Sequence, residues 1–287
     1  MTGLDRHLAG GVTTVCRAWI LSRRDGVVMG FTDHDGAVEV DGVRCAAATG
    51  FDAGAVERGT GLAVDTSEVV GALSADAITA ADVRAGRWDG AGVVGYLVNW
   101  AAPSERAVTF RGRLGEIVEG GGRFTAELRG LSDALNAVRG RIFQRRCDAV
   151  LGDGRCGADL ALTSRVAEVA LHAVEEDGAV LVLDRGAVAV PEGGFAHGRC
   201  LWLDGAALGL EAVVADDVAA GAERRLRLRA APRAAARPGD LVRLTVGCDR
   251  RFETCRDRFG NASNFRGFPH VPGEDWLVAG PVPGAVR

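Results

Sequence analysis

Short apolar runs separated by turn residues dominate the first 140 residues of the chain. Residues 12–21 are mostly apolar, the turn Arg24-Asp25-Gly26 follows, and residues 27–31 continue with the same character. Two apolar runs joined by a Gly-containing turn predict a β-hairpin. We predict three further strands in this part, the last two joined by a Gly-rich turn, at 96–100, 107–118 and 123–129.

Helical signals in this part are confined to two short stretches. Residues 75–88 are predicted to form a short helix. Within this stretch, Thr79 and Asp82 have the spacing of a capping pair. Ser132 is placed to cap a second helix over residues 133–138. The pattern therefore predicts a mainly β (α+β) fold with few short helices.

A second β-rich block lies at residues 161–246. Short apolar strands recur there at regular spacing, with the turns Asp177-Gly178, Asp204-Gly205 and Pro238-Gly239 between them. Such a series predicts a small antiparallel β-barrel. Its six predicted strands are 166–174, 179–184, 199–204, 209–214, 224–229 and 241–246.

Composition places the chain among globular proteins with a proper core. Of its 287 residues, 47% are hydrophobic and 25% are charged. The formal net charge of −4 argues against a protein that binds polyanions over its whole surface. Apolar runs stay well below the roughly 20 residues of a membrane helix, so we expect no membrane insertion and folding in a reducing cytosol.

The seven cysteines fall into two groups. Cys16, Cys45 and Cys200 lie in apolar, strand-like sequence, where a thiol is usually a small core residue. The other four form a C-x8-C pair and a C-x6-C pair in polar, Gly-rich sequence, where a buried core cysteine is not expected. Because the second β-block lies between the pairs, it is predicted to be an insertion between two halves of one thiolate site. The candidate ligands are Cys147, Cys156, Cys248 and Cys255.

Spacing alone does not choose the metal. Structural zinc favours two to four residues between paired ligands, whereas iron–sulfur clusters accept four thiolates from longer loops. Two disulfides remain a third possibility if the protein matures outside the cell. Arginines crowd the same loops, and we expect their charge to lower the pKa of the thiols. They are Arg145, Arg146, Arg155, Arg250, Arg251 and Arg256.

An enzyme is the competing functional class. Asp33-His34-Asp35 could supply carboxylates to a divalent metal, as in a nuclease. On a strand, however, the histidine would face away from the two aspartates, so a polar turn is the favoured interpretation. An iron–sulfur or zinc-dependent enzyme that processes nucleic acid or catalyses redox chemistry stays open as the alternative. Neither a G-x-S-x-G nor an H-E-x-x-H motif occurs in the sequence.

The cysteine pattern resembles a known family. The pairs, followed by RFGNASNFRGFPHVPGED, are similar to the C-terminal iron–sulfur domain of tail-tip proteins of long-tailed phages, the minor tail protein L type. In that family, cysteines at these two spacings ligate a [4Fe-4S] cluster. The resemblance thus implies that Cys147, Cys156, Cys248 and Cys255 do so here. The long insert between Cys156 and Cys248 is a departure from the compact phage form.

The N-terminal half resembles a second group, the baseplate hub proteins of prophages and gene transfer agents. The similar stretches include GFTDHDGAVEVDGVRCAAATGFDAGAVE and FRGRLGEI. This resemblance implies a structural subunit of β-barrel modules that forms a homotrimeric ring. The ring would join a distal tail protein above to a tip protein below, with DNA passing through its lumen. The expected location is the tail tip of a particle assembled in the bacterial cytoplasm.

Together these observations predict three structural parts. Residues 1–140 form a β-rich hub domain, and residues 161–246 form the inserted barrel. Residues 141–160 and 247–287 form a small, loop-rich iron–sulfur domain that is split in sequence.

Overall fold

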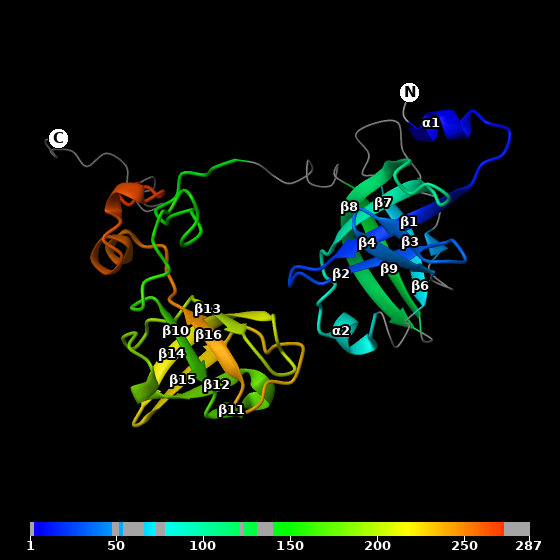
Figure 1. Cartoon of the computed structure of the whole chain (residues 1–287). Helices are drawn as coiled ribbons and strands as arrows, with labels where there is room; N and C mark the ends of the chain where they lie inside the picture. The colour runs from blue at the N-terminus through cyan, green and yellow to red at the C-terminus, as the bar shows by residue number, and fades with distance from the viewer. Residues whose placement is uncertain are drawn as a thin grey trace, which may run out of the picture. The chain divides into compact units, whose positions relative to one another are not determined.

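The computed structural model describes residues 3–47, 52–53, 66–72, 78–120, 123–130 and 140–272, and confirms the mainly β fold (Figure 1). The chain divides into two compact units, Met1–Val138 and Arg139–Arg287. None of the helices among the described residues is long and apolar enough to cross a membrane. Each unit is described by itself below.

The first unit is built on a nine-stranded sheet of order β3-β4-β2-β1-β7-β8-β9-β6-β5. Only β2 and β4 pair in parallel; the other described neighbours are antiparallel. Its elements are α1 (Gly3–Leu8), β1 (Val15–Ser22), β2 (Val28–Thr32), β3 (Val38–Val40), β4 (Val43–Ala47), β5 (Asp52–Ala53), β6 (Thr66–Ala72), α2 (Ala80–Arg84), β7 (Gly92–Asn99), β8 (Arg106–Gly120) and β9 (Arg123–Gly130).

Most sequence predictions for this unit are confirmed, with two corrections. The hairpin β1–β2 forms, and the Thr79 side chain accepts from Asp82 N at 3.1 Å, but α2 covers only Ala80–Arg84. Strand β7 begins at Gly92, before the predicted start. Gly92 and Gly95 lie inside this strand and not in a turn. A Cβ on Gly95 would lie 2.6 Å from the Trp19 ring, so glycine is needed at this position for packing. The predicted helix 133–138 lies outside the described residues.

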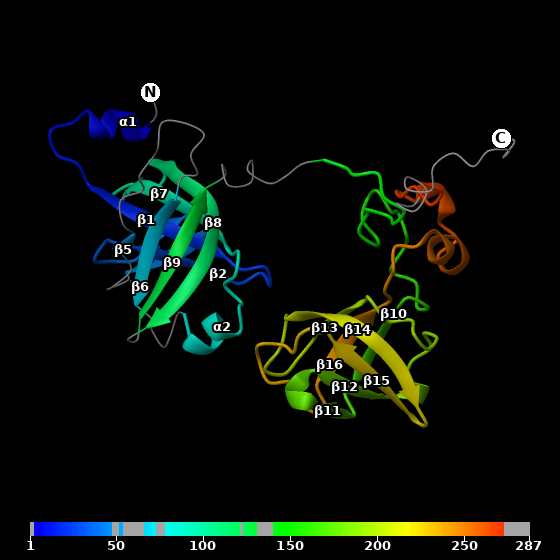
Figure 2. The same ribbon diagram turned by 180° about the vertical axis from the view of Figure 1, so that it is seen from behind.

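The second unit contains the predicted small antiparallel barrel, seen from behind in Figure 2. Its strand order is β10-β16-β13-β14-β15-β12-β11. Only Leu171 and His172 separate β10 from β11, so one bent strand pairs with β16 and then with β12 and closes the sheet. The strands are β10 (Val166–Ala170), β11 (Ala173–Glu175), β12 (Val180–Asp184), β13 (Arg199–Trp202), β14 (Glu211–Ala220), β15 (Glu223–Leu228) and β16 (Leu241–Thr245).

Buried and exposed residues alternate along β14, β15 and β16, and the buried side chains fill the barrel interior. Trp202 and Phe195 are fully buried in this core. The core also contains a buried ion pair between Arg224 and Asp217, in which Arg224 lies over the Phe195 ring. Short 3-10 turns, η2 (Glu176–Gly178) and η3 (Arg185–Ala187), flank β12.

Two loop segments of the second unit lie outside the barrel. We call residues 140–165 the first arm and residues 246–272 the second arm. The first arm has no regular helix or strand among its residues, all of which are described, and the second has a single π-helical turn, η4 (Thr254–Arg258), and a 3-10 turn, η5 (Ala262–Asn264). The boundary of the compact units lies close to residue 140. The finer separation of barrel and arms into two domains stays a prediction.

Candidate metal centre

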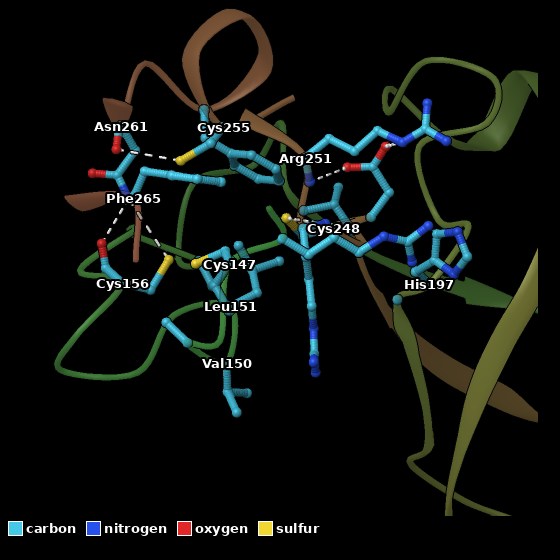
Figure 3. A pocket seen from close by; sticks show the side chains of 18 of the residues that line it. Cys147, Val150, Leu151, Cys156, His197, Cys248, Arg251, Cys255, Asn261 and Phe265 are labelled. Atoms are coloured by element: carbon cyan, nitrogen blue, oxygen red, sulfur yellow. Dashed lines mark hydrogen bonds and ion pairs between the residues drawn. The ribbon is translucent and has the colours of Figure 1, made fainter. Parts of the chain in front are cut away.

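The structure brings the four predicted ligands to one cavity. Cys147 and Cys156 come from the first arm, Cys248 and Cys255 come from the second, and all four line a cavity of 640 Å³. Figure 3 shows the four sulfur atoms around this common space. Cys255 is buried, and the other three thiols are half-buried. Segments separated by the whole barrel thus contribute equally to the site.

The first arm is shaped by the side chain of Asp153. Its Oδ1 accepts from Arg155 N at 2.9 Å and from Cys156 N at 2.7 Å, and its Oδ2 accepts from Val150 N at 3.0 Å. These backbone amides hold the pKa of Asp153 below its usual value. A carboxylate that accepts three amides fixes the turn on which Cys156 lies.

The second arm leaves β16 through a close backbone approach. A Cβ on Gly247 would lie 1.8 Å from Ala196 O, so only glycine fits where the chain crosses the 191–198 loop. Arg250 then adopts φ 65°, which turns the chain back on itself. The π-helical turn η4 follows and carries Cys255, whose amide donates to Arg251 O at 3.1 Å.

Hydrogen bonds join the arms across the cavity. Cys147 N donates to Arg250 O at 2.9 Å, and Phe268 N donates to Gln144 O at 2.9 Å. The side chain of Asn261 donates through Nδ2 to Cys156 O at 2.6 Å. The arms therefore hold each other mainly through polar contacts.

Three of the four candidate ligand sulfurs accept an N–H group. Arg250 N lies 3.3 Å from Cys248 Sγ, Arg266 N lies 3.4 Å from Cys147 Sγ, and Asn261 Nδ2 lies 3.6 Å from Cys156 Sγ. Cys255 instead donates its thiol proton to Asn261 O at 3.3 Å. Ligation by Cys255 would replace this proton with a metal.

The expectation that arginines lower the thiol pKa values is wrong for the second arm. Burial raises the pKa of Cys255 to about 11 and also raises the pKa of Cys248. The negative charge of neighbouring thiolates adds to both effects. Two of these arginines form ion pairs with carboxylates, Arg155 with Asp148 and Arg256 with Asp257, and these carboxylates partly neutralise their charge. A bound metal would supply the positive charge that four clustered thiolates require.

Four cysteine thiols form a donor set that both structural zinc and a [4Fe-4S] cluster use. Among the residues that the structure describes, no three or more His, Cys, Asp or Glu side chains form a group that could hold one metal ion. The four thiols line one cavity. Zinc would need sulfurs at about 2.3 Å, whereas a [4Fe-4S] cluster takes four thiolates at its corners.

The remaining cysteines lie in the cores, as predicted. Cys16, Cys45 and Cys200 are buried. Burial raises the pKa of Cys45 to about 11 and that of Cys200 to about 12. Their burial among the apolar side chains of the two cores agrees with the predicted packing role.

Asp33-His34-Asp35 lies in a bend after β2, as the polar-turn interpretation predicts. Asp33 Oδ1 accepts from Arg17 N at 2.7 Å. The His34 ring contacts Gly36 and lies 4.9 Å from the Trp100 ring, between centroids. The bend is therefore explained by its local contacts.

Sequence reasoning missed the part that Asn261 plays in the site. It lines the cavity and contacts both Cys156 and Cys255. In the sequence it is one of several polar loop residues after Gly260, and nothing in their pattern distinguishes it.

Comparisons with known proteins found two family models that match different stretches of the chain. Residues 1–159 match the family described as baseplate hub protein, N-terminal attachment domain, and residues 193–275 match the family described as phage conserved hypothetical protein BR0599. A search of curated proteins found no match.

A solved structure is similar to this chain along nearly its whole length. A chain from the "Virion of native gene transfer agent (GTA) particle" is 51% identical in sequence, with a TM-score of 0.90. The alignment covers 99% of this chain and 97% of that chain. With more than half of its residues matching the hub family and a relative this similar along its length, the chain belongs to the baseplate hub proteins of phage-like particles.

Proposed function

We propose that this chain is a ring-forming hub subunit at the tail tip of a gene transfer agent, stapled by a [4Fe-4S] cluster on Cys147, Cys156, Cys248 and Cys255. One observation carries the cluster: four cysteines from segments on either side of the barrel line a single cavity. The family match and the virion relative support the structural role.

The composition of the arms supports a staple. Only a few of their described side chains are buried and apolar, among them Ala149, Ala158 and Phe259. Such a set is too small to offset the conformational entropy of ordering both loops. When bound, a cluster supplies four metal–thiolate links, and its binding free energy becomes folding free energy for the arms.

The residues of the chain prepare that site. The Asp153 turn presents Cys156, and η4 presents Cys255. Backbone amides of Arg250 and Arg266 point at Cys248 and Cys147. This preorganisation lowers the cost of gathering four thiolates in one place.

The assembly that we propose is a homotrimeric ring between a distal tail protein above and a tip protein below. DNA passes through its lumen without sequence recognition, and the particle assembles in the bacterial cytoplasm. The hub family and the virion relative support this placement. The net charge of −4 agrees with a conduit that does not retain DNA.

The cluster is tested on protein made in iron-replete cells and purified without oxygen. We expect brown protein with about four irons and four acid-labile sulfides per chain. Stoichiometric zinc without sulfide would overturn the cluster and leave a zinc staple in its place.

The ring is tested separately by cryo-electron microscopy of complete particles. We expect threefold symmetry in the layer that contains this chain, because heterologous contacts close into a ring at a fixed rotation. A twofold dimer of this chain in mature particles would contradict the hub placement.

A further inference from the structure

We infer that Asn261 is the positioning residue of the metal centre, holding the Cys156 and Cys255 ligands together and tuning the Cys156 sulfur. This inference rests on the proposed cluster and deepens it. It concerns a residue that is not a ligand but contacts two ligands from opposite arms.

The contacts of Asn261 span the site. Its Nδ2 lies 2.6 Å from Cys156 O and 3.6 Å from Cys156 Sγ, across 105 positions of sequence. Its backbone nitrogen donates to Cys255 O at 3.0 Å, and its carbonyl oxygen accepts from Cys255 Sγ at 3.3 Å. Figure 3 shows Asn261 between these two cysteines. One residue thus links a ligand before the barrel to a ligand after it.

The orientation of the Asn261 amide follows from its partners. Cys156 O is a carbonyl oxygen and can only accept, so the amide atom 2.6 Å away must be the nitrogen. On the other side, Asn264 Nδ2 donates to Asn261 Oδ1 at 2.7 Å. The Cys156 carbonyl therefore fixes the orientation that directs the N–H groups of Asn261 at Cys156, and Asn264 Nδ2 can donate to the remaining oxygen.

Asn261 differs from the other N–H donors to the ligand sulfurs. Those found in the described part of the chain belong to the backbone amides of Arg250 and Arg266, which no substitution removes without proline. Asn261 contributes a side-chain donor. Substitution can therefore test this contact without changing any ligand.

Two consequences follow from this geometry. An N–H donated to a ligating sulfur withdraws electron density and favours the reduced cluster, so its loss shifts the reduction potential to more negative values. Loss of the link between the arms also lets the ligands separate, which speeds release of iron. Removing an outer-shell partner of this kind costs about 10-fold to 100-fold in metal affinity.

The test compares full-length wild-type protein with Asn261→Ala and Asn261→Asp, all purified without oxygen. Iron and sulfide content, the rate of iron loss to the ferrous chelator bathophenanthroline, and the reduction potential are measured on each. We expect about tenfold faster iron loss in both variants. The potential should fall in both, and further in Asn261→Asp because its carboxylate adds negative charge beside Cys156.

Asn264→Ala is the matched control. Asn264 also lines the cavity, and its side-chain amide donates to Oδ1 of Asn261. Its removal leaves the N–H groups of Asn261 available to Cys156, so we expect smaller changes in both the potential and the rate. Equal effects of Asn264→Ala and Asn261→Ala would overturn the specific part given to Asn261.

Failure of this inference and failure of the cluster give different results. Wild-type protein with neither iron nor zinc would overturn both before any variant is made. A wild-type cluster with unchanged potential and iron loss in the Asn261 variants would overturn only the inference. Reduced thermal stability with an unchanged potential would show a merely structural role and would overturn it as well.

Two further comparisons cover the remaining outcomes of the test. Wild-type protein that holds zinc allows the same variants to be compared by zinc release, where unchanged rates overturn the inference. If Asn261→Ala does not fold, Asn261→Ser removes the amide while keeping a small polar side chain. A serine variant with the wild-type potential and rate would overturn the positioning role.

Discussion

The barrel and the two arms of the second unit are stabilised in different ways. The barrel buries Trp202, Phe195 and a series of leucines and valines completely. The arms bury few apolar side chains and are joined by backbone and amide hydrogen bonds around four thiols. Burying a large apolar side chain contributes about 1.5–3 kcal/mol, whereas a hydrogen bond contributes about 0.5–1.5 kcal/mol net. The barrel can therefore fold on its core, whereas the proposed cluster would supply the arms with a cross-link in place of a core.

The two regions are nevertheless coupled through the 191–198 loop. Arg224 donates to Val190 O and Pro191 O from inside the barrel, and Asp217 accepts from Phe195 N at 2.8 Å. The same loop offers Gly194 O to Gly247 N at 3.0 Å and to Arg258 Nη2. The buried ion pair thus fixes the place at which the second arm leaves the barrel.

The largest expected effect comes from removing the cross-link. Changing Cys147, Cys156, Cys248 or Cys255 singly to serine should abolish the cluster and disorder both arms, because each ligand closes the same link. Limited proteolysis should show new cleavage at 141–160 and 247–272 while the barrel persists, and particles should lack a complete tip. Variants that assemble complete tips but deliver no DNA would contradict the staple and indicate a role in ejection.

A second substitution destabilises the barrel instead of the arms. Arg224→Leu leaves Asp217 buried without its partner, and breaking a buried pair costs about 3–5 kcal/mol of unfolding free energy. Urea unfolding measures this loss, and cleavage of the second arm should rise as well. Arg227→Leu is the control, since its pair with Glu176 is exposed to solvent and should matter little. Equal effects of the two variants would refute the part given to the buried pair.

A third change separates core thiols from ligand thiols. Cys200→Ala should cost about 1 kcal/mol at neutral pH and leave iron content unchanged. Burial raises the pKa of Cys200 from 9.0 to about 12, so the unfolded chain releases this proton at lower pH than the folded chain. The stability that Cys200 contributes is therefore present below pH 9 and is lost as the pH rises from 9 towards 12.

Urea unfolding at pH 8, 9 and 10 measures this alkaline loss. Because the chain contains no lysine and one tyrosine, thiols make up most of the side chains that titrate in this window. Cys200→Ala should lose less stability with rising pH than the wild type, since Cys45 and Tyr96 are common to both proteins. Parallel pH profiles would mean that Cys200 does not stay protonated in the fold.

The smallest effect is expected in the first unit, where a polar turn resembles a site. Asp33→Asn combined with Asp35→Asn should leave particle assembly and DNA delivery near the wild-type level. Asp33 makes a local hydrogen bond to Arg17 N at the protein surface, and an asparagine oxygen can accept it too. Measured transfer of DNA by variant particles tests this, and a complete loss with intact tips would point to chemistry at these carboxylates.

Much of the architecture could be predicted from the sequence because it depends on local patterns. Short apolar runs at regular spacing, separated by turn residues, predicted the barrel strands, and β14 to β16 show an alternating burial. The spacing of Thr79 and Asp82 predicted the start of α2. The polar surroundings of Cys147, Cys156, Cys248 and Cys255 separated them from the buried Cys16, Cys45 and Cys200.

Only the tertiary structure decided what the two arms do together. The extent of β7 depends on packing, since a Cβ on Gly95 would collide with the Trp19 ring. The pKa values of Cys248 and Cys255 follow burial and mutual repulsion, which a count of nearby arginines does not reveal. Asn261 lies 105 positions from Cys156, and their contact exists only because the barrel returns the chain to its starting side. Sequence records neighbours along the chain, whereas hydrogen bonding and desolvation act between neighbours in space.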